Sequence, residues 1–82
     1  MASQIDGVQV QVAWLFRILD YEHWTLLLDG DEVGQLITNR ADNTIRLMMY
    51  PNGANGDTRH LWPSCKAFYR WVKFHPAAER PR

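Results

Sequence analysis

The feature that most constrains the fold of this chain is a change in the spacing of its apolar residues near residue 62. In residues 8–18 every second residue is apolar, a period of two that is typical of a β-strand. From residue 63 to residue 74 the apolar residues recur at helical spacing instead. Because the apolar face of a sheet must be covered, one amphipathic helix after the strands can complete a small core. The residues predicted to share the core face of the first strand are Val8, Val10, Val12, Trp14, Phe16 and Ile18.

The predicted fold is of the α+β class: an antiparallel sheet of three to five strands packed by one C-terminal helix, in the order β-β-β-β-α. The expected strands cover residues 8–19, 23–28, 32–38 and 44–50, with a short final strand at 58–61. Residues 20–22 are expected to form a turn, and Asp29-Gly30-Asp31 predicts a tight hairpin, because glycine accepts positive φ without steric cost. Residues 51–57 contain a proline and two Asn-Gly pairs, which predict a loop with neither strand nor helix.

The C-terminal segment predicts a helix that ends before Pro76. Pro63 suits the first helical turn, and Ser64 is an alternative N-cap. On a helical projection the residues of one broad arc are apolar and are expected to lie on the sheet: Cys65, Phe68, Trp71, Val72 and His75, with Tyr69 at the edge. A separate stripe is basic and is expected to face water: Lys66, Arg70 and Lys73.

The length of 82 residues predicts a single domain, residues 1–76, followed by a flexible tail, residues 77–82. Cys65 is the only cysteine, so no internal disulfide is expected, and no basic leader region or long apolar span stands out. These features predict a cytoplasmic protein. Residues 1–35 hold one basic and six acidic side chains, whereas residues 36–82 hold eight basic and three acidic ones. This asymmetry indicates either a partner-facing surface or an attraction between the two halves.

No pattern of catalytic or metal-binding residues is found in the sequence. The available soft ligands, which lack the paired spacing of a zinc site, are His23, His60, His75 and Cys65. Ser64 and Cys65 stand where the helix begins, but Cys65 falls on the apolar arc and is predicted to be a buried, inert thiol. No glycine-rich phosphate loop precedes the helix. We therefore expect no enzymatic activity, no metal or other cofactor, no small-molecule substrate and no membrane partner.

Binding to another protein is the predicted function. Four Trp, three Tyr and three Phe exceed what one small core hides, and aromatic side chains with arginine dominate binding hot spots. The predicted partner-binding residues are Arg46, Tyr50, Lys66, Arg70, Lys73 and Phe74. One alternative is a nucleic-acid-binding domain that uses the basic helix stripe and the strand arginines, although the isoelectric point of about 6.8 argues against it. Another is a homo-oligomeric structural protein, or a homodimer formed through an edge strand or a sheet face.

Two segments carry a resemblance to a known group of proteins. They are Trp24-Thr25-Leu26-Leu27-Leu28-Asp29-Gly30-Asp31-Glu32-Val33-Gly34-Gln35-Leu36 and Leu61-Trp62-Pro63-Ser64-Cys65-Lys66-Ala67-Phe68-Tyr69-Arg70-Trp71-Val72. Together they resemble small uncharacterised phage and prophage proteins with a Trp…Leu…Asp-Gly…Val-Gly hairpin and a closing helix. The resemblance implies a phage-encoded modulator or inhibitor of a host protein, as anti-CRISPR proteins and polymerase inhibitors are. No individual functional residue follows from it.

Overall fold

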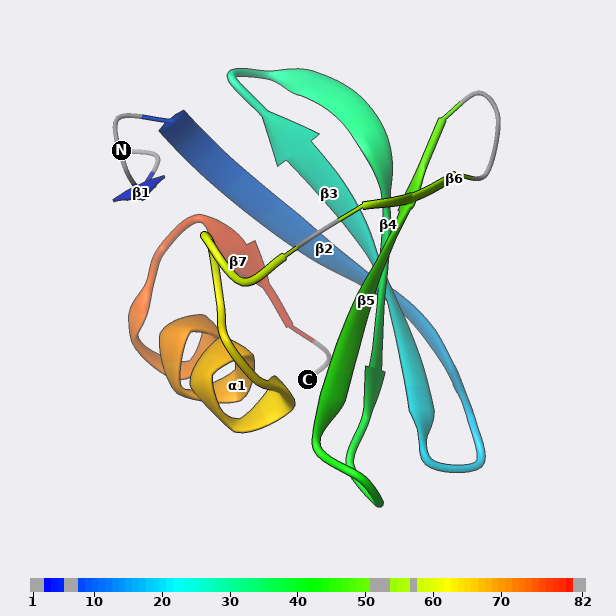
Figure 1. Cartoon of the computed structure of the whole chain (residues 1–82). Coiled ribbons are helices and arrows are strands. Elements are labelled where there is room, and N and C mark those ends of the chain that lie inside the picture. The colour runs from blue at the N-terminus through cyan, green and yellow to red at the C-terminus, as the bar shows by residue number, and fades with distance from the viewer. Residues whose placement is uncertain (1–2, 6–7, 51–53, 57, 81–82) are drawn as a thin grey trace.

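In the computed structural model, one helix packs against one face of a strongly twisted sheet (Figure 1). The structure describes residues 3–5, 8–50, 54–56 and 58–80. The elements are β1 (Ser3–Ile5), β2 (Val8–Ile18), β3 (Tyr21–Leu28), β4 (Asp31–Asn39), β5 (Thr44–Met49), β6 (Ala54–Gly56), α1 (Cys65–Phe74) and β7 (Ala78–Glu79). Strands β1 to β6 lie side by side in chain order, each antiparallel to the next, and β7 adds to β2 in parallel. The α+β class and the order of the four long strands and the helix are confirmed.

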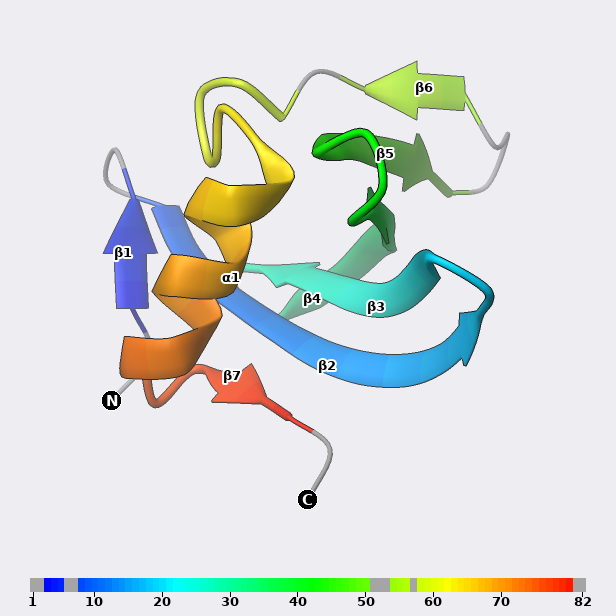
Figure 2. The same cartoon turned by 90° about the horizontal axis from the view of Figure 1, so that it is seen from below.

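The core lies between the sheet and the segment that contains α1 (Figures 1 and 2). From the sheet it receives alternate residues of four strands, which the pairing registers place on the same face: Val10, Val12, Trp24, Leu26, Leu36 and Leu47. From the other layer it receives Leu61, Trp62, Phe68, Trp71, Val72 and Ala77. Among the described residues no element covers the opposite face of the sheet, which we call the outer face.

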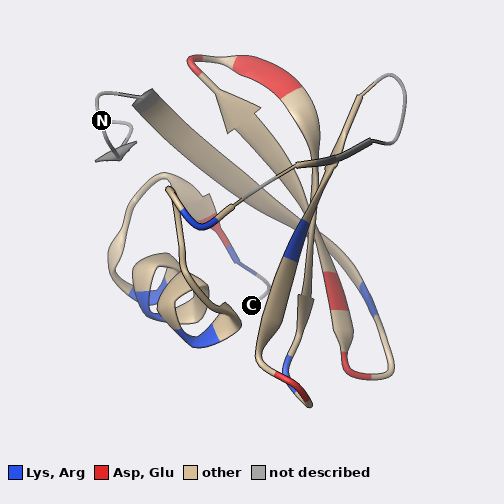
Figure 3. Cartoon of the chain, viewed as in Figure 1, with Lys and Arg blue, Asp and Glu red and all other residues tan. Residues whose placement is uncertain are grey.

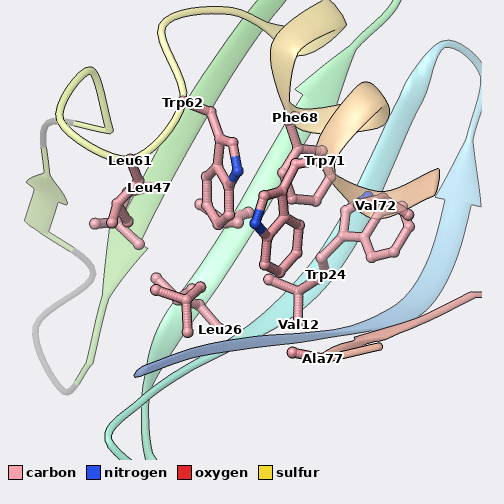
Figure 4. Close-up of a cluster of buried hydrophobic side chains, with 12 residues drawn as sticks. Val12, Trp24, Leu26, Leu47, Leu61, Trp62, Phe68, Trp71, Val72 and Ala77 are labelled. Atoms are coloured by element: carbon pink, nitrogen blue, oxygen red, sulfur yellow. The ribbon is translucent and has the colours of Figure 1, made fainter. Parts of the chain in front are cut away.

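Aromatic rings fill the centre of this core (Figure 4). Phe68 packs edge-on against Trp24, with ring centroids 5.1 Å apart, and against Trp62 at 4.9 Å. The buried indole nitrogens of Trp24, Trp62 and Trp71 have no hydrogen-bond partner in the described part of the chain. Trp62 also lies edge-on to Trp71, at 5.1 Å. Edge-to-face packing is a favourable arrangement for aromatic rings, so these contacts stabilise the core.

Helix α1 ends at Phe74, before Pro76 as predicted, but it begins at Cys65, so Pro63 lies outside its first turn and the alternative N-cap, Ser64, is confirmed. Ser64 is the N-cap: its hydroxyl accepts a hydrogen bond from the backbone N–H of Ala67 at 3.2 Å. Asn43, in the turn between β4 and β5, accepts from the backbone N–H groups of Cys65 and Lys66. The predicted apolar arc is confirmed, since its members are buried or half-buried, and the three cations of the basic stripe are exposed.

The predicted core face of β2 is only half right. A β-bulge between Trp14 and Phe16 shifts the register against β3, so the residues that follow it point to the opposite side. Trp14 pairs with Trp24 on the core side, whereas Phe16 pairs with His23 and stacks on its ring on the outer face, with centroids 4.4 Å apart. Phe16 and Ile18 are therefore exposed, although the unbroken alternation predicts that both are buried.

The shorter elements correct four further expectations. Residues 58–61, predicted as a strand, form a turn, and β6 occupies part of the segment predicted to be a loop. The predicted tail packs against the sheet as far as residue 80, because β7 pairs with β2 and Ala77 is buried; residues 81–82 lie outside the described part. The first hairpin turn consists of Leu19 and Asp20, one residue earlier than predicted. The short strands β6 and β7 form because a longer strand lies beside each of them, and not because their own apolar residues recur at a regular spacing.

Candidate protein-binding surface

The end of the β2–β3 hairpin farthest from α1 carries most of the exposed large apolar side chains of the described residues (Figure 1). We call this set the hairpin surface; it consists of Leu15, Phe16, Ile18, Leu19 and Tyr21. The bulge in β2 produces it, because it turns the second half of an apolar strand away from the core. A soluble monomer rarely exposes a large contiguous apolar patch, and such a patch is typical of an interaction site.

Leu19 is the most unusual member of the hairpin surface. It lies in the two-residue turn between Ile18 and Tyr21 with φ at 55°, and its side chain is 84% exposed. A non-glycine residue in this left-handed region costs about 1–2 kcal/mol. Tight hairpin turns normally place glycine, asparagine or aspartate at positive φ. The tight hairpin between β3 and β4 has this usual composition, with Asp29 and Gly30 both at positive φ.

A buried carboxylate lies at the base of the hairpin surface. Glu22 faces the core side of β3, and its carboxylate accepts a hydrogen bond from Trp14 Nε1 at 2.9 Å and another from the Tyr69 hydroxyl at 2.6 Å. The Nε of Arg40 lies 3.2 Å from the same carboxylate. A buried charge is tolerated when it is paired and hydrogen-bonded, as Glu22 is. This ion pair also links the acidic first half of the chain to the basic second half.

Tyr69 connects this carboxylate to the helix. Its hydroxyl shares a hydrogen bond of 2.8 Å with the Thr38 hydroxyl, and the guanidinium of Arg40 lies 4.3 Å from the centre of its ring. Burial raises the pKa of Tyr69, and the hydrogen bond to the Glu22 carboxylate raises it further. The contact with Tyr69 is the main cause of a raised pKa at Arg40, which therefore remains a cation.

Arg40 stands between two open grooves. One, with a volume of about 510 Å³, is lined by Trp14, Phe16, Arg17, Glu22 and Arg40 and adjoins the hairpin surface. The other, of about 390 Å³, is lined by Arg40, Asn43, Cys65, Lys66 and Tyr69. Among the described residues, Glu22 is the one acidic member of either lining, whereas three cations contribute to them. Both grooves therefore favour a negatively charged group.

The network around Tyr69 predicts a loss of stability in alkaline solution. The unfolded chain releases the Tyr69 proton near pH 10, whereas the folded protein holds it to higher pH. The free energy of unfolding should therefore fall as pH rises above about 10, until the folded pKa is passed. Urea denaturation between pH 8 and 12 should show a shallower decline for Tyr69→Phe than for the parent. Tyr50→Phe, at an exposed tyrosine, is the control, and an equal decline in all three proteins would contradict the raised pKa.

The six partner-binding residues predicted from the sequence do not form one surface. Lys66, Arg70, Lys73 and Phe74 are exposed on the side of α1 away from the sheet, where Figure 3 shows the basic residues of the helix. Arg46 and Tyr50 are exposed as well, but Arg46 pairs with Ile37 in the row that faces outward, with the sheet between it and the helix. The structure separates the six residues onto two faces, and their role in binding stays a prediction.

The residues considered for catalysis have structural roles in this fold. The Ser64 hydroxyl caps α1, and Cys65 is buried, which raises the pKa of its thiol. The described residues hold no cluster of three or more potential metal ligands. Their one helix, of ten residues, is too short to cross a membrane.

Sequence reasoning missed both main features of this site. The sequence predicts Glu22 in a turn. However, Glu22 continues the alternation of Trp24 and Leu26 by one step, and this spacing indicates a charge on the core face. Leu19 has no comparable signal, because its turn is defined by the register of β2 and β3. Comparisons with protein-family models, curated proteins and solved structures gave no match, so the resemblance to phage proteins stays a prediction.

Proposed function

We propose that this protein is a non-enzymatic protein-binding module and that the hairpin surface is its contact surface. The observation that carries the proposal is the exposure of five large apolar side chains at the end of one hairpin, with Leu19 held in a strained conformation at its tip. Strain of this kind costs stability and persists mainly at functional sites. Folding gains nothing from Leu19, whose side chain is almost fully in water.

The composition of the surface supports a protein partner. Phe16 and Tyr21 supply aromatic contact area on the outer face, and Arg17, on the core side of β2, lines the groove at the base of the hairpin together with Phe16. Aromatic residues and arginine are the side chains that contribute most to protein interfaces. The turn also carries Asp20, which would oppose insertion into an anionic membrane surface.

The finer form of the proposal is a phage-encoded modulator or inhibitor of a host protein that acts in the cytoplasm. The support for it is the resemblance of two segments of the chain to small phage proteins. The first search for a partner should therefore use bacterial lysate.

The test compares two variants of the full chain in capture from nuclease-treated lysate. Ile18→Thr/Leu19→Asn removes the apolar tip; threonine suits a strand and asparagine tolerates positive φ, so we expect the free energy of unfolding to rise by about 1 kcal/mol. Capture of the partner should fall at least tenfold. If capture of the partner falls while the free energy of unfolding rises, misfolding of the variant cannot explain the loss of binding. Urea denaturation and quantitative mass spectrometry supply the two readings.

Arg70→Glu/Lys73→Glu is the matched variant on the exposed side of α1. We expect it to keep both its fold and its capture of the partner. Loss of capture in this variant alone would move the binding site to the helix stripe and contradict the hairpin surface. Capture that disappears on nuclease treatment would favour the nucleic-acid alternative, whose phosphate contacts also give a steep dependence on salt.

A further inference from the structure

One edge of β2 has no partner strand among the described residues next to the hairpin surface. The edge away from β3 pairs with β1 over residues 8–10 and with β7 at Val12 and Ala13. Beyond Ala13, over residues 14–18, no strand in the described part of the chain pairs with this edge. Five residues span about 17 Å of strand, with backbone donors and acceptors facing outward. An open edge of this kind is a template for another extended chain.

The two faces of this edge differ in chemistry. Phe16 and Ile18 point to the outer face. Arg17 lies opposite Glu22 in the strand register, so it points to the core side, where it lines the groove of about 510 Å³. The Glu22 carboxylate is already occupied by Trp14, Tyr69 and Arg40. The described residues contain no ion pair to Arg17. The groove beside the edge therefore carries an uncompensated positive charge.

We propose that an extended segment of the partner protein adds to β2 along residues 14–18, with an acidic side chain directed at Arg17 and Arg40. This inference rests on the proposed function and specifies the chemistry of the partner. Cross-strand neighbours share a face, so the acidic residue of the added segment lies beside Arg17. Its two neighbours in sequence lie beside Phe16 and Ile18 and must be apolar. The recognised pattern is thus apolar–acidic–apolar in an extended conformation, a known mode of peptide recognition.

Charge favours such a segment over a second copy of this chain. A two-fold pairing of so short an edge brings the two Arg17 side chains near each other, with no acidic residue of residues 14–18 to offset them. Like charges across a strand pair are destabilising. An acidic segment from another protein converts the same cation into an attractive contact.

The test uses the full chain labelled with ¹⁵N and short capped synthetic peptides. The probe has valine–glutamate–valine at its centre and threonines on both flanks; a matched peptide has lysine in place of glutamate. We expect the acidic peptide to shift the backbone amide signals of residues 14–18 and to bind at least tenfold more tightly than the lysine peptide. In Arg17→Glu this preference should reverse. An unchanged preference would exclude Arg17 as the recognising cation and overturn the proposal.

Two further peptides separate strand addition from simple charge attraction. Each carries one backbone N-methyl group, either on the glutamate or on the valine after it. In an added strand alternate N–H groups face β2, so one methylation should abolish binding and the other should leave it within about threefold. Equal binding of the two methylated peptides would overturn the proposal, and so would no binding by the unmethylated acidic peptide. A concentration-dependent dimer that uses this edge would overturn it as well. The hairpin surface would still stand if Ile18→Thr/Leu19→Asn loses capture while the peptides fail.

Discussion

Phe68→Ala is expected to lower the free energy of unfolding by about 3–5 kcal/mol. Phe68 is 0% exposed, and its ring touches the rings of Trp24 and Trp62 at centroid distances of 5.1 and 4.9 Å. Alanine leaves a cavity that these large, interlocked rings cannot close without losing their own contacts. A domain of 82 residues has a total stability of about 4–12 kcal/mol, so the variant should be close to unfolding at 25 °C.

Urea denaturation followed by circular dichroism measures this loss, and Phe74→Ala is the matched control. Phe74 is on the same helix, but it is 72% exposed and contacts the ammonium group of Lys73 at 5.5 Å instead of the core. Its replacement should change the free energy of unfolding by no more than about 0.5 kcal/mol. A loss below about 1 kcal/mol for Phe68→Ala would show that α1 does not dock on the sheet through this ring.

Gly34→Ala is expected to lower the free energy of unfolding by about 3 kcal/mol, for a reason unrelated to cavities. A Cβ atom at this buried position would collide with the backbone carbonyl of Met48 in the neighbouring strand. Backbone in the middle of a sheet cannot move aside as a side chain can, so β4 and β5 would have to separate locally. Gly34 lies at the end of this pairing, opposite Met49, and next to the bulge at Leu26 and Leu27.

Gly30→Ala is the control, because it changes a glycine that has open space around it. Apart from its two chain neighbours, no described residue has an atom within 4 Å of the position of its Cβ, but φ is 88°, so the cost is backbone strain of about 1–2 kcal/mol. Thermal or urea unfolding of the two variants should rank Gly34→Ala well below Gly30→Ala in stability. Similar values would contradict the close approach of β4 and β5.

The fold class could be predicted because its signals are local. The alternation through Val10 and Val12 predicts a strand with one buried face, and the helical spacing of Phe68, Trp71 and Val72 predicts the element that covers it. Strands β6 and β7 have three and two residues, too few for a period to be visible. They form because the edges of longer strands lie beside them. A pattern within a segment carries no information about its neighbours in space.

The candidate site depends on such neighbours throughout. In the alternation Trp14 and Phe16 look equivalent, and the bulge that separates them exists only in the pairing with β3. The two side chains that donate hydrogen bonds to Glu22, those of Trp14 and Tyr69, are separated from it by 8 and 47 positions in the sequence. The grouping of Arg46 with the helix cations failed for the same reason, since it required knowledge of which sheet face the helix covers. A single sequence shows which side chains are present but not which of them come into contact in the folded chain.

The bulge in β2 also has a consequence for how the sequence can change over time. On one side of it the strand belongs to the core, where Val10 and Val12 are almost fully buried and tolerate little substitution. On the other side the side chains of Phe16, Ile18 and Leu19 are exposed, so substitutions there should change the free energy of unfolding less. The fold thus constrains the residues of one half of β2, whereas the residues of the other half can change with the binding partner. A new binding specificity can therefore arise in the hairpin while the core stays unaltered.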